Sequence, residues 1–117
     1  MFRRMDEDDQ APEPELIIEV INETPAQIVV RIIGEIDLAT RDTLRMHVKP
    51  LIAPSTKIVL DLAGVTFMDS TCLSVLVEVH GDAVERGGEL IIRAPSPVAQ
   101  RLLTVAEIAQ LIRIEPA

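Results

Sequence analysis

The order of apolar segments along this chain predicts an α/β domain built on a mixed β-sheet of about five strands. Short runs rich in Ile, Val and Leu alternate with segments whose apolar residues recur every three or four positions. Such alternation is typical of strands that are joined through helices. The length of 117 residues fits one domain with a single core. Because only Phe2 and Phe67 are aromatic in a chain that is 48% apolar, that core must be aliphatic.

The first two strands are expected at residues 16–21 and 27–33, where β-branched side chains dominate. Residues 22–26 between them read Asn-Glu-Thr-Pro-Ala, which is the composition of a turn. The two strands are therefore predicted to form a hairpin. Gly34 is predicted to end the second strand.

The first helix is predicted over residues 39–52, because its apolar residues follow helical spacing at Leu44, Val48, Leu51 and Ile52. Thr40 is a candidate for the capped start of this helix. Pro50 lacks a backbone N–H, so it is expected to bend or close the last turn.

A central strand is predicted at residues 58–60, which are apolar without alternation. Such a run suits a strand that is covered on both faces, as in a sheet flanked by helices. Residues 63–68 are expected to form a tight connection to the next helix. Because helices lie between this strand and its neighbours along the chain, parallel pairing through right-handed crossovers is predicted.

The second helix is expected to run to about residue 85, with Asp69, Ser70 and Thr71 in its first turn. Its apolar side consists of Cys72, Leu73, Val75, Leu76, Val79, Ala83 and Val84. Its polar stripe consists of Thr71, Ser74, Glu78, Asp82 and Glu85. Ser70 stands at the head of that stripe, where orphan backbone N–H groups and the helix dipole favour an anion or a phosphate.

The remaining elements are predicted from the positions of Gly and Pro, which interrupt helices and strands. Gly87 and Gly88 are expected to stop the second helix, and residues 89–93 form another strand. Ser96, between two prolines, is a candidate cap for a helix over residues 98–107. A short last strand is expected at residues 111–114.

Composition argues against several classes of function. A net charge of −8 opposes direct binding to nucleic acid or to anionic lipid, and a chain without Trp or Tyr offers no platform for stacking bases. One Cys and two separate histidines, His47 and His80, do not have the spacing of a zinc site. Neither a metal nor another cofactor is therefore expected.

The chain lacks the features of an exported or membrane-spanning protein. Nowhere do about 18 apolar residues follow one another, and a single Cys suits the reducing cytoplasm. Residues 1–14 combine an acidic cluster with two prolines, so they are expected to form a flexible tail before a domain of residues 15–117.

Several interpretations of Ser70 are open from the residues alone. A serine nucleophile needs a base within hydrogen-bond reach, but His80 lies ten residues further along the same helix, about 15 Å away. The position of His47 is undetermined, and the Gly-x-Ser-x-Gly motif of many hydrolases is absent. Helix capping alone would also account for Asp, Ser and Thr at this point. Cys72 is expected to pack as a small apolar residue rather than to act as a redox sensor.

Three segments resemble a known family. Residues 67–73, Phe-Met-Asp-Ser-Thr-Cys-Leu, are similar to the Asp-Ser-(Ser/Thr)-Gly-Leu signature of the STAS domain family, in its branch of bacterial anti-sigma factor antagonists. Residues 34–37, Gly-Glu-Ile-Asp, resemble the motif that precedes the first helix of that family. Residues 98–114 resemble its closing helix and last strand, so the resemblance covers about residues 16–114.

The resemblance implies a STAS-like single domain with helices mainly on one side of the sheet. It also implies a protein-binding switch without catalytic activity of its own. The unphosphorylated protein would sequester an anti-sigma factor that is itself a serine kinase, phosphorylation of Ser70 would inactivate it, and a phosphatase would restore it. Thr71 is the secondary site. The expected partner-binding residues are Asp37, Asp69, Thr71, Ser74, Glu78 and Asp82.

The chain departs from the family pattern at three positions. Cys72 and Ser74 stand where the family usually has Gly, and Glu107 replaces another common Gly. These larger residues would narrow the approach of a kinase or select a different partner.

The resemblance also allows an alternative function, because STAS domains serve as accessory or scaffold subunits of membrane transporters or signalling complexes, without phospho-switching.

Overall fold

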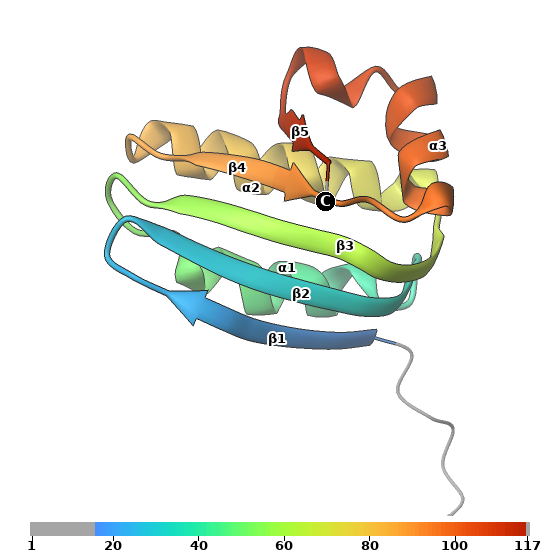
Figure 1. The fold of residues 1–117 in the computed structure, drawn as a ribbon, viewed down its shortest axis with the longest axis horizontal. Helices are drawn as coiled ribbons and strands as arrows, with labels where there is room; N and C mark the ends of the chain where they lie inside the picture. Colours follow the sequence, from blue (N-terminus) through green and yellow to red (C-terminus); the bar gives the residue numbers. More distant parts are fainter. Residues whose placement is uncertain (1–15, 117) are drawn as a thin grey trace, which may run out of the picture.

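The computed structural model describes residues 16–116, which fold around one five-stranded sheet with the strand order β1-β2-β3-β4-β5 (Figure 1). The strands are β1 (Leu16–Glu23), β2 (Gln27–Ile36), β3 (Lys57–Met68), β4 (Glu89–Arg93) and β5 (Arg113–Glu115). β1 pairs antiparallel with β2, and every later pair is parallel. The predicted mixed sheet and the N-terminal hairpin are confirmed. The predicted tail of residues 1–14 lies outside the described residues.

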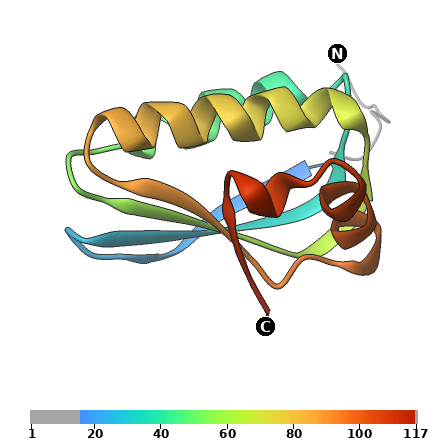
Figure 2. The ribbon, with the colours of Figure 1, turned by 90° about the horizontal axis from the view of Figure 1, so that it is seen from above.

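Three α-helices connect the parallel strands: α1 (Arg41–Val48), α2 (Leu73–Glu85) and α3 (Pro97–Val105). α1 and α2 lie side by side on one face of the sheet (Figure 2), while α3 packs mainly against β3. Successive strands are added in one direction across the sheet, so crossovers of one hand place the helices on the same side. No helix within residues 16–116 has the length and apolar character that a membrane span requires.

The main core fills the space between the sheet and the helices and is aliphatic, as predicted. Its largest fully buried side chains are Val30, Ile32, Ile36, Leu44, Ile58, Leu60, Leu62, Leu76, Leu90, Ile92, Leu103 and Ile112. The other face of the sheet carries a second, smaller cluster, in which Val29, Val59 and Ile91 pair across three strands.

The residues at 58–60 are therefore covered on both faces, but a second layer of helices is not the reason. Lys57 and Asp61, which flank Val59 on the same face of β3, pair with Glu89 and Arg93 of β4. These rows of long polar side chains border the apolar row, and the hydrocarbon stems of such side chains can cover it.

The expected ends of two strands were wrong. β2 continues through Gly34 to Ile36, and β3 continues through residues 63–68, which were expected to be a connection. The pairing of these strands shifts between Arg31 and Ile33 and again between Gly34 and Glu35. β-Bulges of this kind insert unpaired residues and disrupt the alternation of inward and outward side chains along a strand. The sequence of residues 63–68 therefore lacks the alternating pattern that would have predicted a strand.

The helix ends also differ from the expected ones. α1 ends at Val48, and the predicted last turn is a 3₁₀ turn, Lys49–Leu51, that contains Pro50. A second 3₁₀ turn, Ser70–Cys72, precedes α2. Ser96 caps α3 as predicted, since its hydroxyl accepts a hydrogen bond from the backbone N–H of Ala99.

Gly88, between α2 and β4, and Gly81, in the middle of α2, provide a matched test of the packing. A Cβ atom at Gly88 would lie 2.0 Å from the carbonyl oxygen of Thr56, whereas one at Gly81 would meet no atom within 4 Å. We expect Gly88→Ala to lower the free energy of unfolding by at least about 2 kcal/mol, because the backbone must move. Gly81→Ala should raise it by about 0.5–1 kcal/mol, because Gly weakens a helix interior.

Urea unfolding of both variants would measure these changes. A Gly88→Ala protein as stable as wild type would show that the turn between α2 and β4 is not packed against Thr56 as described.

Candidate functional site

The candidate site lies where β2 and β3 end side by side. Ile36 pairs with Met68, the last residue of β3, and the backbone N–H of Asp69 donates a hydrogen bond of 3.2 Å to the carbonyl oxygen of Ile36. Asp37 and Asp69, which follow these two strands, therefore stand at one edge of the sheet. The carboxyl ends of parallel strands are the usual place for functional residues in open α/β sheets.

Asp37 organises the start of α1. Its Oδ1 accepts hydrogen bonds of 3.0 Å from the backbone N–H groups of Ala39 and Thr40. The hydroxyl of Thr40 in turn accepts from the N–H of Asp37 at 3.0 Å and donates to the carbonyl oxygen of Glu35 at 2.8 Å. Thr40 does not itself cap the helix with its side chain. The predicted capping function thus falls to Asp37, which satisfies N–H groups that precede the first turn.

Asp69 has the same structural function at the start of the turn that leads into α2. Its Oδ1 accepts from the backbone N–H of Thr71 at 2.9 Å and from the Thr71 hydroxyl. Asp69 is therefore the N-cap, and Ser70 is the first residue of the turn. The Thr71 side chain is half-buried and engaged, whereas Ser70 is exposed. Of the two neighbouring hydroxyls, that of Ser70 is the accessible one.

Cys72 faces the core immediately after these residues. Its side chain is fully buried, and its Sγ donates to the carbonyl oxygen of Asp69. Burial, with a smaller contribution from the negative charge of Asp69, raises the pKa of the Cys72 thiol to about 12. A thiol that stays protonated is a poor nucleophile, so Cys72 is a packing residue, as expected.

The polar stripe of α2 faces a row of cations, Arg41, Arg45 and Lys49, on α1 and the 3₁₀ turn that follows it. Glu78 forms ion pairs with Arg45 at 3.2 Å and with Lys49 at 2.5 Å, and Lys49 also reaches Asp82 at 3.0 Å. The hydrogen bond from Lys49 lowers the pKa of the Glu78 carboxyl, and hydrogen bonds to Glu78 and Asp82 raise the pKa of the Lys49 ammonium group. These two acidic residues, predicted to bind a partner, are thus already paired within the domain.

The row of cations continues to the start of α2. Nη1 of Arg41 donates to the carbonyl oxygen of Thr71 at 3.3 Å, and the hydroxyl of Ser74 donates to the same oxygen at 3.1 Å. These cations were not predicted as site residues, although the four-residue spacing of Arg41, Arg45 and Lys49 places them on one face of a helix. That spacing was the available signal.

The two histidines lie in structural or surface positions. His47 is exposed, and its Nδ1 lies 2.8 Å from the carbonyl oxygen of Thr43 in its own helix. Nδ1 of His80 accepts a hydrogen bond of 3.2 Å from the backbone N–H of Leu90, so His80 ties α2 to the start of β4.

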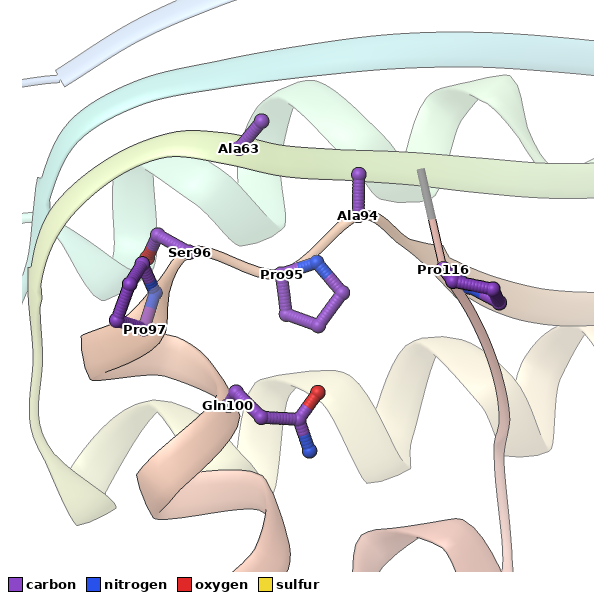
Figure 3. A pocket seen from close by; sticks show the side chains of 7 residues that line it. All are labelled: Ala63, Ala94, Pro95, Ser96, Pro97, Gln100 and Pro116. Carbon is purple, nitrogen blue, oxygen red and sulfur yellow. The ribbon is translucent and has the colours of Figure 1, made fainter.

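The residues of the candidate site form an exposed edge that is separate from the pocket in Figure 3. That pocket has a volume of about 410 Å³ and lies between β3, the start of α3 and the C-terminal segment. Its walls are Ala63, Ala94, Pro95, Ser96, Pro97, Gln100 and Pro116, and they include none of the predicted site residues.

Comparison with known proteins agrees with this architecture. The family model of the STAS domain matches residues 16–117. The chain belongs to the STAS domain family. It is 32% identical over 89 residues, 74% of its length and 76% of the relative's, to a protein of Paenibacillus polymyxa named as an anti-sigma F factor antagonist.

Solved structures of this family share the fold. An anti-sigma factor antagonist from Mycobacterium paratuberculosis superposes with a TM-score of 0.77 and 23% identity, over 92% of each chain. The anti-sigma factor antagonist SpoIIAA in its unphosphorylated form superposes with a TM-score of 0.69 and 20% identity, over 85% of this chain and 86% of the other. At these identities, the structures establish the fold of the STAS domain here.

The first test of the site separates the cap from the accessible hydroxyl. Asp69→Ala leaves the N–H of Thr71 without its acceptor, so we expect the free energy of unfolding to fall by about 0.5–2 kcal/mol. Ser70→Ala, which removes an exposed hydroxyl next to it, should change that energy by less than about 0.5 kcal/mol. Urea unfolding measures both, and the reverse order of effects would make Ser70 the cap.

A second test concerns the charges between α1 and α2. The pKa of Glu78 is lowered by folding, so its contribution to stability is present above its ordinary value of 4.5 and disappears as the pH falls through the folded value. The pKa of Lys49 is raised, so its contribution is present below 10.5 and disappears at higher pH. We expect Lys49→Met to lower the melting temperature at about pH 7 and to have much less effect at a pH below the folded pKa of Glu78, which itself lies below 4.5.

Lys57→Met is the matched control, because Lys57 is exposed on β3 and, although it stands opposite Glu89 in the sheet, forms no ion pair with a carboxylate within residues 16–116. A Lys49→Met deficit of the same size at both pH values would reflect lost packing rather than lost ion pairs.

Proposed function

We propose that this STAS domain is an anti-sigma factor antagonist that sequesters an anti-sigma factor with serine kinase activity and is inactivated by phosphorylation at Ser70. The observation that carries the proposal is the state of Ser70. It is exposed at the start of the turn, while the neighbouring Thr71 and Cys72 direct their polar atoms to Asp69. The relationship to proteins named as anti-sigma factor antagonists supports the identity of the partner.

The surface around Ser70 is proposed to bind the anti-sigma factor. Ser74 is exposed one turn further along α2, and Asp37 and Asp69 border the edge from which Ser70 projects. Thr71 is the secondary phosphorylation site, and its engagement with Asp69 makes it the less accessible acceptor. Glu78 and Asp82 contribute as members of ion pairs with Arg45 and Lys49, so the partner contacts charges of both signs between the two helices.

The proposed switch is electrostatic. A phosphate group adds about −1.5 to −2 charges beside Asp69, while the first turn of a helix tolerates an anion because of its dipole and unpaired N–H groups. The domain therefore stays folded when it is phosphorylated. The added charge and volume prevent close packing of the partner, which releases the kinase. The domain itself is proposed to act in the cytoplasm without catalysis, and a phosphatase restores the binding form.

The experiment compares wild type, Ser70→Ala and Ser70→Asp for binding to the cognate anti-sigma factor, with and without ATP. Wild type should lose binding in ATP as Ser70 becomes phosphorylated. Ser70→Ala should bind under both conditions, because it lacks the acceptor hydroxyl. Ser70→Asp should bind at least about tenfold more weakly without ATP, a loss of about 1.4 kcal/mol.

Ser55→Asp is the matched control. Ser55 is also an exposed serine, but it precedes the amino end of β3, opposite the candidate site, and its φ of 59° is one that Asp tolerates. It should bind like wild type. If ATP leaves wild-type binding unchanged and no phosphate appears on Ser70 by mass spectrometry, the proposal is wrong, and the domain functions as an accessory or scaffold subunit without phospho-switching.

A further inference from the structure

Arg41 is a cation whose hydrogen-bonding capacity is incompletely used. It is the first residue of α1, and its side chain crosses to the first turn before α2, where Nη1 donates to the carbonyl oxygen of Thr71. Its Nε is buried and has no hydrogen-bond partner in the structure. A buried N–H without an acceptor is uncommon in folded proteins and requires an explanation.

The other two cations of the row differ from Arg41 in this respect. Arg45 pairs with Asp42 and Glu78, and Lys49 pairs with Glu78 and Asp82. Arg41 forms no ion pair with a carboxylate within residues 16–116. Its guanidinium group thus has a carbonyl oxygen where its neighbours have anions.

The contact that holds Arg41 can be released without leaving a polar atom unsatisfied. The carbonyl oxygen of Thr71 also accepts a hydrogen bond of 3.1 Å from the hydroxyl of Ser74. If Arg41 turned away, this oxygen would keep one donor. Ser74, which stands where the family usually has Gly, is what provides this second donor.

We propose that Arg41 is the residue of this chain that binds the phosphate of phosphorylated Ser70. This inference rests on the proposed function, in which Ser70 is phosphorylated. Arg41 is close to that site because it contacts Thr71, the residue immediately after Ser70. A phosphoserine presents three strong acceptor oxygens, and a guanidinium group offers donors in a planar fork that matches them. The phosphate would provide the anion that Arg41 lacks and an acceptor for its unpaired Nε–H group.

The phosphate is then held over the seam between α1 and α2 instead of extending freely into solvent. Arg41 is a positioning residue in this arrangement, because it places the phosphate where the partner would otherwise pack. Phosphorylation should accordingly stabilise the domain, and part of that stabilisation should depend on the Arg41 side chain.

The experiment uses protein in which phosphoserine is incorporated at position 70 during synthesis, so that no kinase is needed. Two quantities are measured for wild type and for Arg41→Gln: the change in melting temperature caused by the phosphate, and the pH titration of the phosphate followed by phosphorus NMR. In wild type we expect the phosphate to raise the melting temperature by on the order of 3 °C and to titrate at lower pH than in Arg41→Gln. Most of the temperature gain should be lost in that variant.

Arg45→Gln is the matched control, since it removes the same charge one turn further along α1. It should lower the stability of both forms while leaving the titration of the phosphate nearly unchanged. Arg41→Lys, which keeps the charge without the fork, should restore part of the effect. Equal titration midpoints in wild type and Arg41→Gln, or equal effects of Arg41→Gln and Arg45→Gln, would overturn the inference.

The two proposals fail in distinguishable ways. If Ser70 is not a substrate of the anti-sigma factor, binding in the presence of ATP does not change, yet the titration still reports whether Arg41 contacts a phosphate at this position. If Arg41 does not bind the phosphate, the binding switch remains testable through Ser70→Ala and Ser70→Asp.

Discussion

The parallel pairing of β2 with β3 is the constraint on which the candidate site depends. It brings Ile36 beside Met68, so that the chain leaves both strands at the same edge of the sheet. Asp37 and Asp69 then use their carboxylates to hold backbone N–H groups at the start of α1 and of the turn before α2. Without this pairing, the two acidic residues, which are 32 positions apart in the sequence, would not lie at the same edge of the sheet.

Hydrogen bonds within the turn explain why Ser70 is exposed while Thr71 is half-buried and Cys72 is buried. Asp69, Thr71 and Cys72 are connected by hydrogen bonds within the turn, and Cys72 anchors that turn in the core. Ser70 is left as an accessible hydroxyl on a rigid support. A modification at this point changes the charge of the surface without requiring a change of fold, which suits a reversible switch of protein binding.

The charges on the surface of α1 and α2 are more balanced than the net charge of the chain suggests. The chain has a net charge of −8, yet the acidic residues of α2 form ion pairs with Arg45 of α1 and with Lys49 of the turn that follows it. Repulsion of a partner by an extended acidic face is therefore not the basis of the proposed switch. A local change at Ser70, beside a cation that has no anionic partner among the described residues, is the more specific mechanism.

Where prediction from the sequence failed, tertiary pairing was the reason. Residues 63–68 belong to β3, but bulges opposite β2 disrupt their alternation. Glu107 occupies a position with a φ of 57°, which explains why a glycine is common there, but a single sequence does not reveal that conformation. The choice between Ser70 and Asp69 as the cap could not be made either, because both residue types are good caps.

The sequence by itself determined the α/β class, the hairpin, the aliphatic core, the order of the elements and the Asp-Ser-Thr turn at the head of α2. These features depend on periodicity and on local residue preferences, which can be recognised in the sequence without knowledge of the fold. Tertiary structure alone decided which hydroxyl is accessible, that Glu78 and Asp82 are paired, and that Arg41 lies against Thr71 with a buried N–H unused. The accessibility of Ser70 depends on the hydrogen bonds that Thr71 and Cys72 form within their turn. The other two features depend on distances between segments about 30 residues apart in the chain, and no local pattern encodes such distances.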